Sequence, residues 1–130
     1  MGLQDRAARV KVERLTSAED FRRAYREGQR VSDSLATVYV RRTGLPVHRV
    51  GIAVGKRIGS AVKRNRLRRK AREAYRQLRA KPPAGTDLVI VPRSAAADAG
   101  FAAIQDSLRQ LLVRAGLLMV PSEVRAEDGI

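Results

Sequence analysis

The chain has 130 residues, 44% of them hydrophobic, which is enough to bury one core but not two, and we therefore predict one domain over residues 1–130. It has 27 lysines and arginines against 13 acids, a net charge of +14, and no cysteine, which excludes disulfides and thiolate metal sites. The N-terminal residues are polar and no apolar run approaches the length of a membrane span, so we expect a soluble, cytoplasmic protein without a membrane partner.

In the first part of the chain, the residue pattern predicts a loose arm followed by a short helix. Residues 1–13 mix basic and apolar groups without helical periodicity, and we expect them to form a loose basic arm. Ser17 is a candidate N-cap for a helix that carries Phe21 and Tyr25 on one face and ends at Gly28. Core packing is the simpler interpretation of the two aromatic residues, and contact with a ligand is the alternative.

Two strands are predicted next, over residues 35–42 and 47–55, because residues of opposite character alternate along both segments. A turn at residues 43–46 allows the two strands to pair as a hairpin. In that hairpin Tyr39 and Arg41 would stand beside a nearly bare strand face, which suits a single strand of nucleic acid because an aromatic ring stacks on any base. An ordinary solvated sheet face is the alternative. The bare face consists of Gly51, Ala53 and Gly55.

The positive charge is concentrated in residues 55–79, which hold eleven basic residues against a single acid, Glu73. An apolar stripe indicates that this segment docks on a core as a helix, with Ser60 as its N-cap and arginines on its outer face. The stripe consists of Leu67, Ala71, Ala74, Tyr75 and Leu78. Planar guanidinium groups bind phosphate oxygens in pairs and stack on bases, so this face predicts a nucleic-acid partner. An anionic membrane surface is the weaker alternative, because two alanines give the stripe little bulk.

The C-terminal half completes the predicted fold. Residues 88–91 are wholly apolar and predict a buried central strand, and residues 94–100 predict a linker of small residues. Residues 101–116 carry an apolar stripe typical of a helix that covers a sheet, and residues 117–130 are expected to form a loose tail. The resulting order of helix, strand, strand, basic helix, strand and helix predicts an α+β sandwich with one sheet and helices packed on it.

No catalytic constellation can be assembled from the sequence. His48 is the single histidine, and we interpret it as a surface or edge residue because no nucleophile or carboxylate partner is evident. The acids are scattered singly, without metal-ligand spacing. Residues 51–57, GIAVGKR, are superficially similar to a phosphate-binding loop but lack its spacing and its Ser or Thr. The chemistry that remains is that of the basic helix.

One long motif resembles a known family. Residues 49–76, RVGIAVGKRIGSAVKRNRLRRKAREAYR, closely resemble the signature of the bacterial ribonuclease P protein subunit, in which an Arg-Asn-Arg motif lies at the start of a basic helix. The resemblance extends over roughly residues 14–115, where the predicted elements match the family's order. It implies a ribosomal-protein-like α+β sandwich whose strand–helix–strand crossover is left-handed, against the usual rule.

The resemblance implies a non-catalytic partner of a catalytic RNA that removes the 5′ leader from precursor tRNA. Hydrolysis would be carried out by the ribonuclease P RNA and its magnesium ions, and no protein partner is implied. Six residues would contact the catalytic RNA: Arg64, Asn65, Arg66, Arg68, Arg69 and Arg72. Four residues would line a central cleft that holds the leader: Phe21, Tyr39, Lys56 and Arg57.

The chain departs from the family pattern at a few positions. Ser60 stands where the family usually has asparagine, and Tyr75 where phenylalanine is frequent. Arg57 and Arg68 stand where lysine is common. The serine keeps an N-cap, and the tyrosine should preserve packing. Two other functions stay open: a ribosomal or general structural RNA-binding protein, which would use the same arginine face without a cleft, and a protein-only nuclease.

Overall fold

The computed structural model describes residues 11–80 and 82–118 of the chain. Most of the predicted arm and of the predicted tail therefore lies outside the described residues. The elements in chain order are β1 (Val12–Arg14), α2 (Ala18–Glu27), β2 (Gln29–Ser32), β3 (Ala36–Arg42), β4 (His48–Ile52), the 3₁₀ turn η1 (Lys56–Ile58), α3 (Ala61–Leu78), β5 (Thr86–Pro92), the 3₁₀ turn η2 (Ser94–Asp98) and α4 (Phe101–Arg114).

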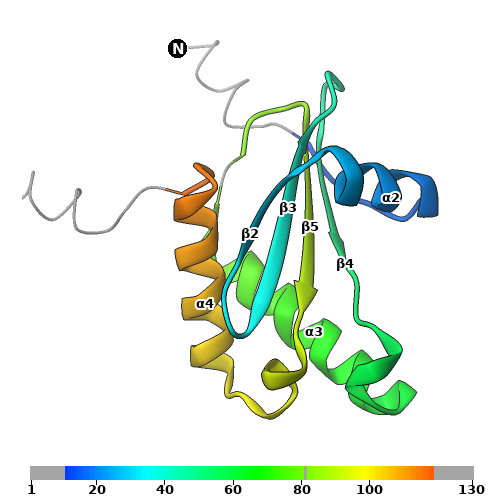
Figure 1. The fold of residues 1–130 in the computed structure, drawn as a ribbon. Helices are drawn as coiled ribbons and strands as arrows, with labels where there is room; N and C mark the ends of the chain where they lie inside the picture. The colour runs from blue at the N-terminus through cyan, green and yellow to red at the C-terminus, as the bar shows by residue number, and fades with distance from the viewer. Residues whose placement is uncertain (1–10, 81, 119–130) are drawn as a thin grey trace, which may run out of the picture.

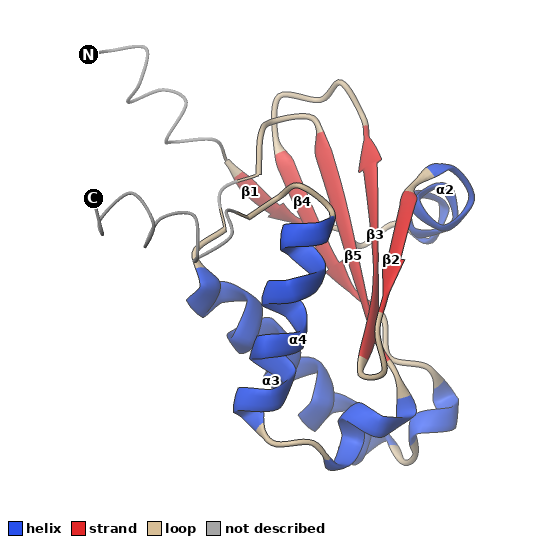
Figure 2. Cartoon of the chain, turned by 60° about the vertical axis from the view of Figure 1, so that its left-hand side comes forward, coloured by secondary structure: helices blue, strands red, loops and turns tan. Residues whose placement is uncertain are grey.

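The five strands form one mixed sheet in the order β1-β4-β5-β3-β2. Figure 1 shows β4, β5, β3 and β2 side by side, and Figure 2 also labels β1. Strand β5 lies at the centre, parallel to β4 and antiparallel to β3. Residues 35–42 and 47–55 therefore do not pair as the hairpin that the turn at residues 43–46 would allow, because β5 separates the two strands. The physical reason is that β5 is apolar on both faces and takes the position with a neighbour on each side.

Helices cover both faces of the sheet. Figure 2 shows α3 and α4 on one side of the sheet and α2 on the other. The main core lies under α3 and α4, where Val38, Leu88 and Ile90 of the sheet meet Leu108 and Leu111 of α4. This arrangement confirms the predicted α+β class and the predicted alternation in residues 35–42. The crossover from β4 through α3 to β5 joins parallel neighbours, and its left hand stays an expectation from the resemblance.

The predicted helix boundaries are confirmed by their caps. The Ser17 hydroxyl accepts a hydrogen bond from a backbone N–H of the first turn of α2 at 3.3 Å. The Ser60 hydroxyl does the same for α3 at 3.2 Å. Gly28 ends α2 where the chain turns back against its own helix, since a Cβ atom there would lie 2.5 Å from the Ala24 carbonyl oxygen. Only glycine fits this close approach.

Four segments differ from the expectations. Residues 12–14, largely within the predicted arm, form β1 and pair in parallel with β4. Strand β2 is not among the predicted elements, and residues 94–98 of the predicted linker form a 3₁₀ turn. Leu117, the first residue of the predicted tail, is only 7% exposed and belongs to the main core. Edge strands this short carry too few residues for an alternation to be visible in the sequence.

Candidate nucleic-acid interface

Helix α3 presents its arginines because its other face is docked. Leu67, Ala71 and Ala74 are buried against the sheet and α4, as the apolar stripe predicts. Of the six residues predicted to contact RNA, four are exposed on α3: Asn65, Arg66, Arg69 and Arg72. The other two, Arg64 and Arg68, are half-buried. The structure thus brings all six residues together on one helix.

The arginines of α3 differ in their partners. Arg76 forms a two-pronged ion pair with Glu73, whose pKa is lowered mainly by that hydrogen bond. Arg68 donates to the side-chain oxygen of Asn65 at 2.6 Å, which joins two of the predicted contact residues. Within the part of the chain that the structure describes, Arg72 forms no ion pair, and the buried Nε of Arg64 has no hydrogen-bond partner. The exposed guanidinium group of Arg72 remains available to phosphate oxygens.

An aromatic row lies on the opposite face of the sheet. The Tyr25 and Tyr39 rings meet edge to face with centroids 4.9 Å apart, and the Phe21 and Tyr25 centroids are 6.4 Å apart. Phe21 covers Gly51 so closely that a Cβ atom there would lie 2.6 Å from the ring. The expectation that small residues leave a bare floor for a ligand is therefore wrong at Gly51, where the floor is filled by Phe21.

A partly buried network of charges fastens α2 to this face. Arg49 donates to both carboxylate oxygens of Asp87 at 2.8 and 2.7 Å and to Asp20 at 3.0 Å. Arg41 pairs with Glu27 at 3.1 Å and with Asp87 at 3.5 Å. The pKa of Arg49 is raised, chiefly by its hydrogen bond to Asp87. Arg41, predicted to stand beside a nucleic-acid strand, is thus held by two acids of the fold.

The four residues predicted to hold the leader come from three elements. Phe21 on α2 and Tyr39 on β3 share a small apolar cluster with Leu15 and Val89. Lys56 and Arg57 are exposed on η1, which follows β4 and precedes α3. Phe21 and Tyr39 are thus brought together, whereas within residues 11–80 and 82–118 no hydrogen bond or ion pair joins η1 to them.

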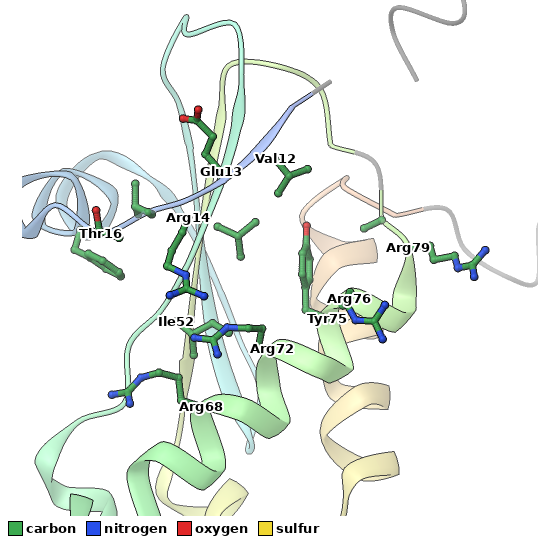
Figure 3. A pocket seen from close by; sticks show the side chains of 14 residues that line it. Val12, Glu13, Arg14, Thr16, Ile52, Arg68, Arg72, Tyr75, Arg76 and Arg79 are labelled. Atoms are coloured by element: carbon green, nitrogen blue, oxygen red, sulfur yellow. The ribbon is translucent and has the colours of Figure 1, made fainter. Parts of the chain in front are cut away.

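A cleft of about 680 Å³ opens between β1 and α3 (Figure 3). Its apolar surfaces come from Val50 and Ile52 on β4 and from Tyr75 on α3, and Phe21 also lines it. Arginines from β1 and α3 stand around it, with Arg14 extending toward α3 in Figure 3. Sequence reasoning missed this cleft because it depends on β1, a strand that no periodicity indicated.

His48 is buried, so its interpretation as a surface or edge residue is wrong. It is 1% exposed, and its Nδ1 lies 2.9 Å from the Thr86 carbonyl oxygen. Its Nε2 lies 3.1 Å from the Tyr75 hydroxyl of α3. Burial lowers the pKa of His48 and raises that of Tyr75 to about 12. The partners are distant in sequence, which is why none was evident.

Most of the acidic side chains in the described residues are paired with basic ones. Seven acids form ion pairs: Glu13, Glu19, Asp20, Glu27, Glu73, Asp87 and Asp106. Over residues 11–80 and 82–118, no three His, Cys, Asp or Glu side chains are grouped as a metal site would require. Over the same residues, no helix combines the length and apolar character needed to cross a bilayer.

Comparison with known proteins finds similarity over most of the chain. The family model for ribonuclease P matches residues 10–116. The ribonuclease P protein component of Caldanaerobacter subterraneus subsp. tengcongensis is 35% identical over 109 residues, which cover 84% of this chain and 94% of that protein. That of Symbiobacterium thermophilum is 39% identical over 110 residues, covering 83% and 95%. A solved Staphylococcus aureus RNase P protein mutant with defective mRNA degradation activity matches with a TM-score of 0.73 at 32% identity, covering 81% of this chain and 89% of that one.

Proposed function

The chain belongs to the ribonuclease P protein family, and we propose that it binds the catalytic RNA of that endoribonuclease through the outer face of α3. The RNA–protein complex removes the 5′ leader from precursor tRNA in the cytoplasm. The observation that carries the proposal is a docked helix whose exposed side is rich in arginine and contains a single acid, Glu73. Such a face neutralises phosphates, and the affinity it supplies depends steeply on salt.

The RNA-contact residues are the six that the motif identifies. Arg66, Arg69 and Arg72 are exposed on α3 and reach phosphate oxygens directly. Arg68 and Asn65 act as a pair, because their hydrogen bond at 2.6 Å orients the guanidinium group. Arg64 is half-buried on the same helix and adds its positive charge to this face.

The 5′ leader of precursor tRNA binds to a second surface of the protein in this proposal. Phe21 and Tyr39 supply half-buried aromatic rings on the α2 face of the sheet, where unpaired bases can stack. Lys56 and Arg57 on the exposed turn η1 supply charge for the leader's backbone. Arg49, paired with Asp87 of the sheet, also donates to Asp20 of α2 and thereby holds α2, and with it Phe21, over the sheet.

Hydrolysis belongs to the RNA subunit in this proposal, together with magnesium ions held mainly by the RNA. The protein's part is to bind and orient the two RNA molecules. The pairing of most of its described acids with arginine and lysine side chains supports this division, because a carboxylate held in an ion pair is a poor candidate for a metal ligand.

Reconstitution tests the proposal. We would measure cleavage of a precursor tRNA at physiological magnesium by a bacterial ribonuclease P RNA with the protein, by the RNA without it, and by the protein alone. Cleavage that rises only when both components are present is the expected result. No stimulation, combined with tight binding to unrelated structured RNA, would favour a general RNA-binding protein, and cleavage by the protein alone would favour a protein nuclease.

A further inference from the structure

We propose that the cleft between β1 and α3 holds one unpaired nucleotide of RNA, with its base on the apolar floor and its phosphate between Arg14 and Arg72 (Figure 3). This inference rests on the proposed function, because it adds a binding site to an RNA-binding protein. It differs from the two surfaces described above, since neither the predicted RNA contacts nor the predicted leader contacts include Arg14, Val50, Ile52 or Tyr75.

The floor of the cleft is apolar and built from two elements. Val50 and Ile52 are half-buried on β4, and the Tyr75 ring stands beside them on α3. Val12, which is 63% exposed, lies at the rim. A volume of about 680 Å³ lies within the range of roughly 300–1,000 Å³ that is usual for sites of small organic ligands. A base with its ribose therefore fits, and burying the base removes Val50 and Ile52 from water.

The rim carries positive charge that the fold does not compensate. Arg14 on β1 extends toward α3, and Arg72 extends from α3 toward β1 (Figure 3). Over the described residues, neither arginine forms an ion pair. The acid at the rim, Glu13, is paired with Lys11 at 3.5 Å. Two guanidinium groups from facing elements form a clamp for one phosphate, since each can donate two hydrogen bonds to its oxygens.

The position of the cleft explains how a strand would enter it. Arg68 and Arg72 belong both to the cleft and to the residues predicted to contact RNA, so a strand bound along α3 continues into the cleft without leaving the protein. Charge complementarity favours RNA over a second copy of this chain, because another molecule with a net charge of +14 would bring like charge to the same arginines. The nucleotide can belong to the catalytic RNA or to the precursor leader.

Site-specific crosslinking in the complete RNA–protein complex tests the inference. The chain has no cysteine, so Val12→Cys provides a single attachment point for a photoreactive group at the rim. The matched control is Gln29→Cys, an exposed residue on β2 at the opposite edge of the sheet. We expect the group at position 12 to crosslink to a small set of neighbouring nucleotides. Mapping them on the catalytic RNA and on the end-labelled precursor identifies the source.

Further variants test the role of the arginine clamp and the space above the apolar floor. Arg14→Ala should reduce the crosslink yield and weaken RNA binding about fivefold or more. Arg30→Ala removes the same charge from the opposite edge and should leave both unchanged. Val12→Trp, at an exposed position, should weaken binding by filling the cleft while all charges stay in place.

The outcomes separate this inference from the proposed function. A complex that cleaves precursor tRNA but gives no more crosslinks from position 12 than from position 29 would overturn the nucleotide site and leave the proposed function intact. Equal binding by Arg14→Ala and Arg30→Ala would also overturn it. If the unmodified protein does not stimulate cleavage of precursor tRNA by the catalytic RNA, the proposed function is wrong, and the inference that rests on it fails as well.

Discussion

The Tyr75 hydroxyl and His48 Nε2 lie 3.1 Å apart and join the basic helix to the sheet. The Thr86 carbonyl oxygen, 2.9 Å from His48 Nδ1, can only accept a hydrogen bond. Neutral His48 therefore carries its proton on Nδ1 and accepts a hydrogen bond on Nε2 from the Tyr75 hydroxyl. This pairing fixes how α3 sits on β4, and thus where its arginines stand.

Tyr75→Phe should lower the free energy of unfolding by about 1–2 kcal/mol, because it leaves buried Nε2 without a partner. Urea titration of the protein checks this prediction. Tyr25→Phe is the matched control, since Tyr25 is 41% exposed and its hydroxyl has no hydrogen bond among the described residues. Equal losses in the two variants would show that the hydroxyl of Tyr75 contributes nothing specific.

Protein stability should fall as the pH drops below 6.5, the ordinary pKa of histidine. Burial lowers the pKa of His48 in the fold, and the hydrogen bond to the Thr86 backbone and the nearby Asp87 only partly oppose this effect. The unfolded chain therefore binds a proton at a higher pH than the folded chain does. The free energy of unfolding falls by at most about 1.4 kcal/mol for each pH unit in this range. Urea titrations between pH 5.5 and 7.5 measure this slope. The chain has one histidine, so His48→Gln should flatten it, and a slope unchanged in that variant would contradict the prediction.

Asp87→Asn should destabilise the fold by about 3–5 kcal/mol, because it leaves Arg49 half-buried without its principal partner. Asp87 is completely buried, and it also forms an ion pair with Arg41. The control is Asp106→Asn on the exposed face of α4, where an ion pair contributes little. Denaturant midpoints of the two variants check the prediction, which would be wrong if they shifted alike.

The basic helix could be predicted because its signal is local. Its apolar stripe, its N-cap Ser60 and its arginines all lie within one stretch of chain, and a helix fixes their relative positions by its own geometry. The same holds for the alternation in β3 and for the apolar run in β5. Contacts within one element therefore agree with the sequence analysis.

Contacts between distant elements could not be predicted in this way. The insertion of β5 between β3 and β4, the pairing of Arg49 with Asp87, and the bond from Tyr75 to His48 each join residues far apart in the chain. Alternation shows that a strand has two faces but does not say which strand is its neighbour. The bare face at Gly51 is visible in the sequence, yet its occupant, Phe21, comes from a different element.

Gly51→Ala should destabilise the protein by about 1–3 kcal/mol and displace Phe21, because the new Cβ atom would lie 2.6 Å from the ring. In the complex, the same variant should weaken binding that depends on the leader. Gly55→Ala is the matched control, since a Cβ atom there meets nothing within 4 Å. Urea titration and the affinity for precursors with and without a leader measure the two effects. Equal stabilities would mean that Phe21 does not pack on Gly51.

Arg72→Ala should weaken binding to the catalytic RNA and make it less sensitive to salt. Arg72 is exposed on α3, and removing its interaction with one phosphate should reduce the slope of log affinity against log salt by about 0.7–0.9. Titrations of labelled RNA at several potassium chloride concentrations give this slope. Arg30→Ala removes the same charge from the far edge of the sheet, so it separates direct phosphate binding from a general effect of net charge. An equal change of slope in both variants would mean that the outer face of α3 points away from the RNA.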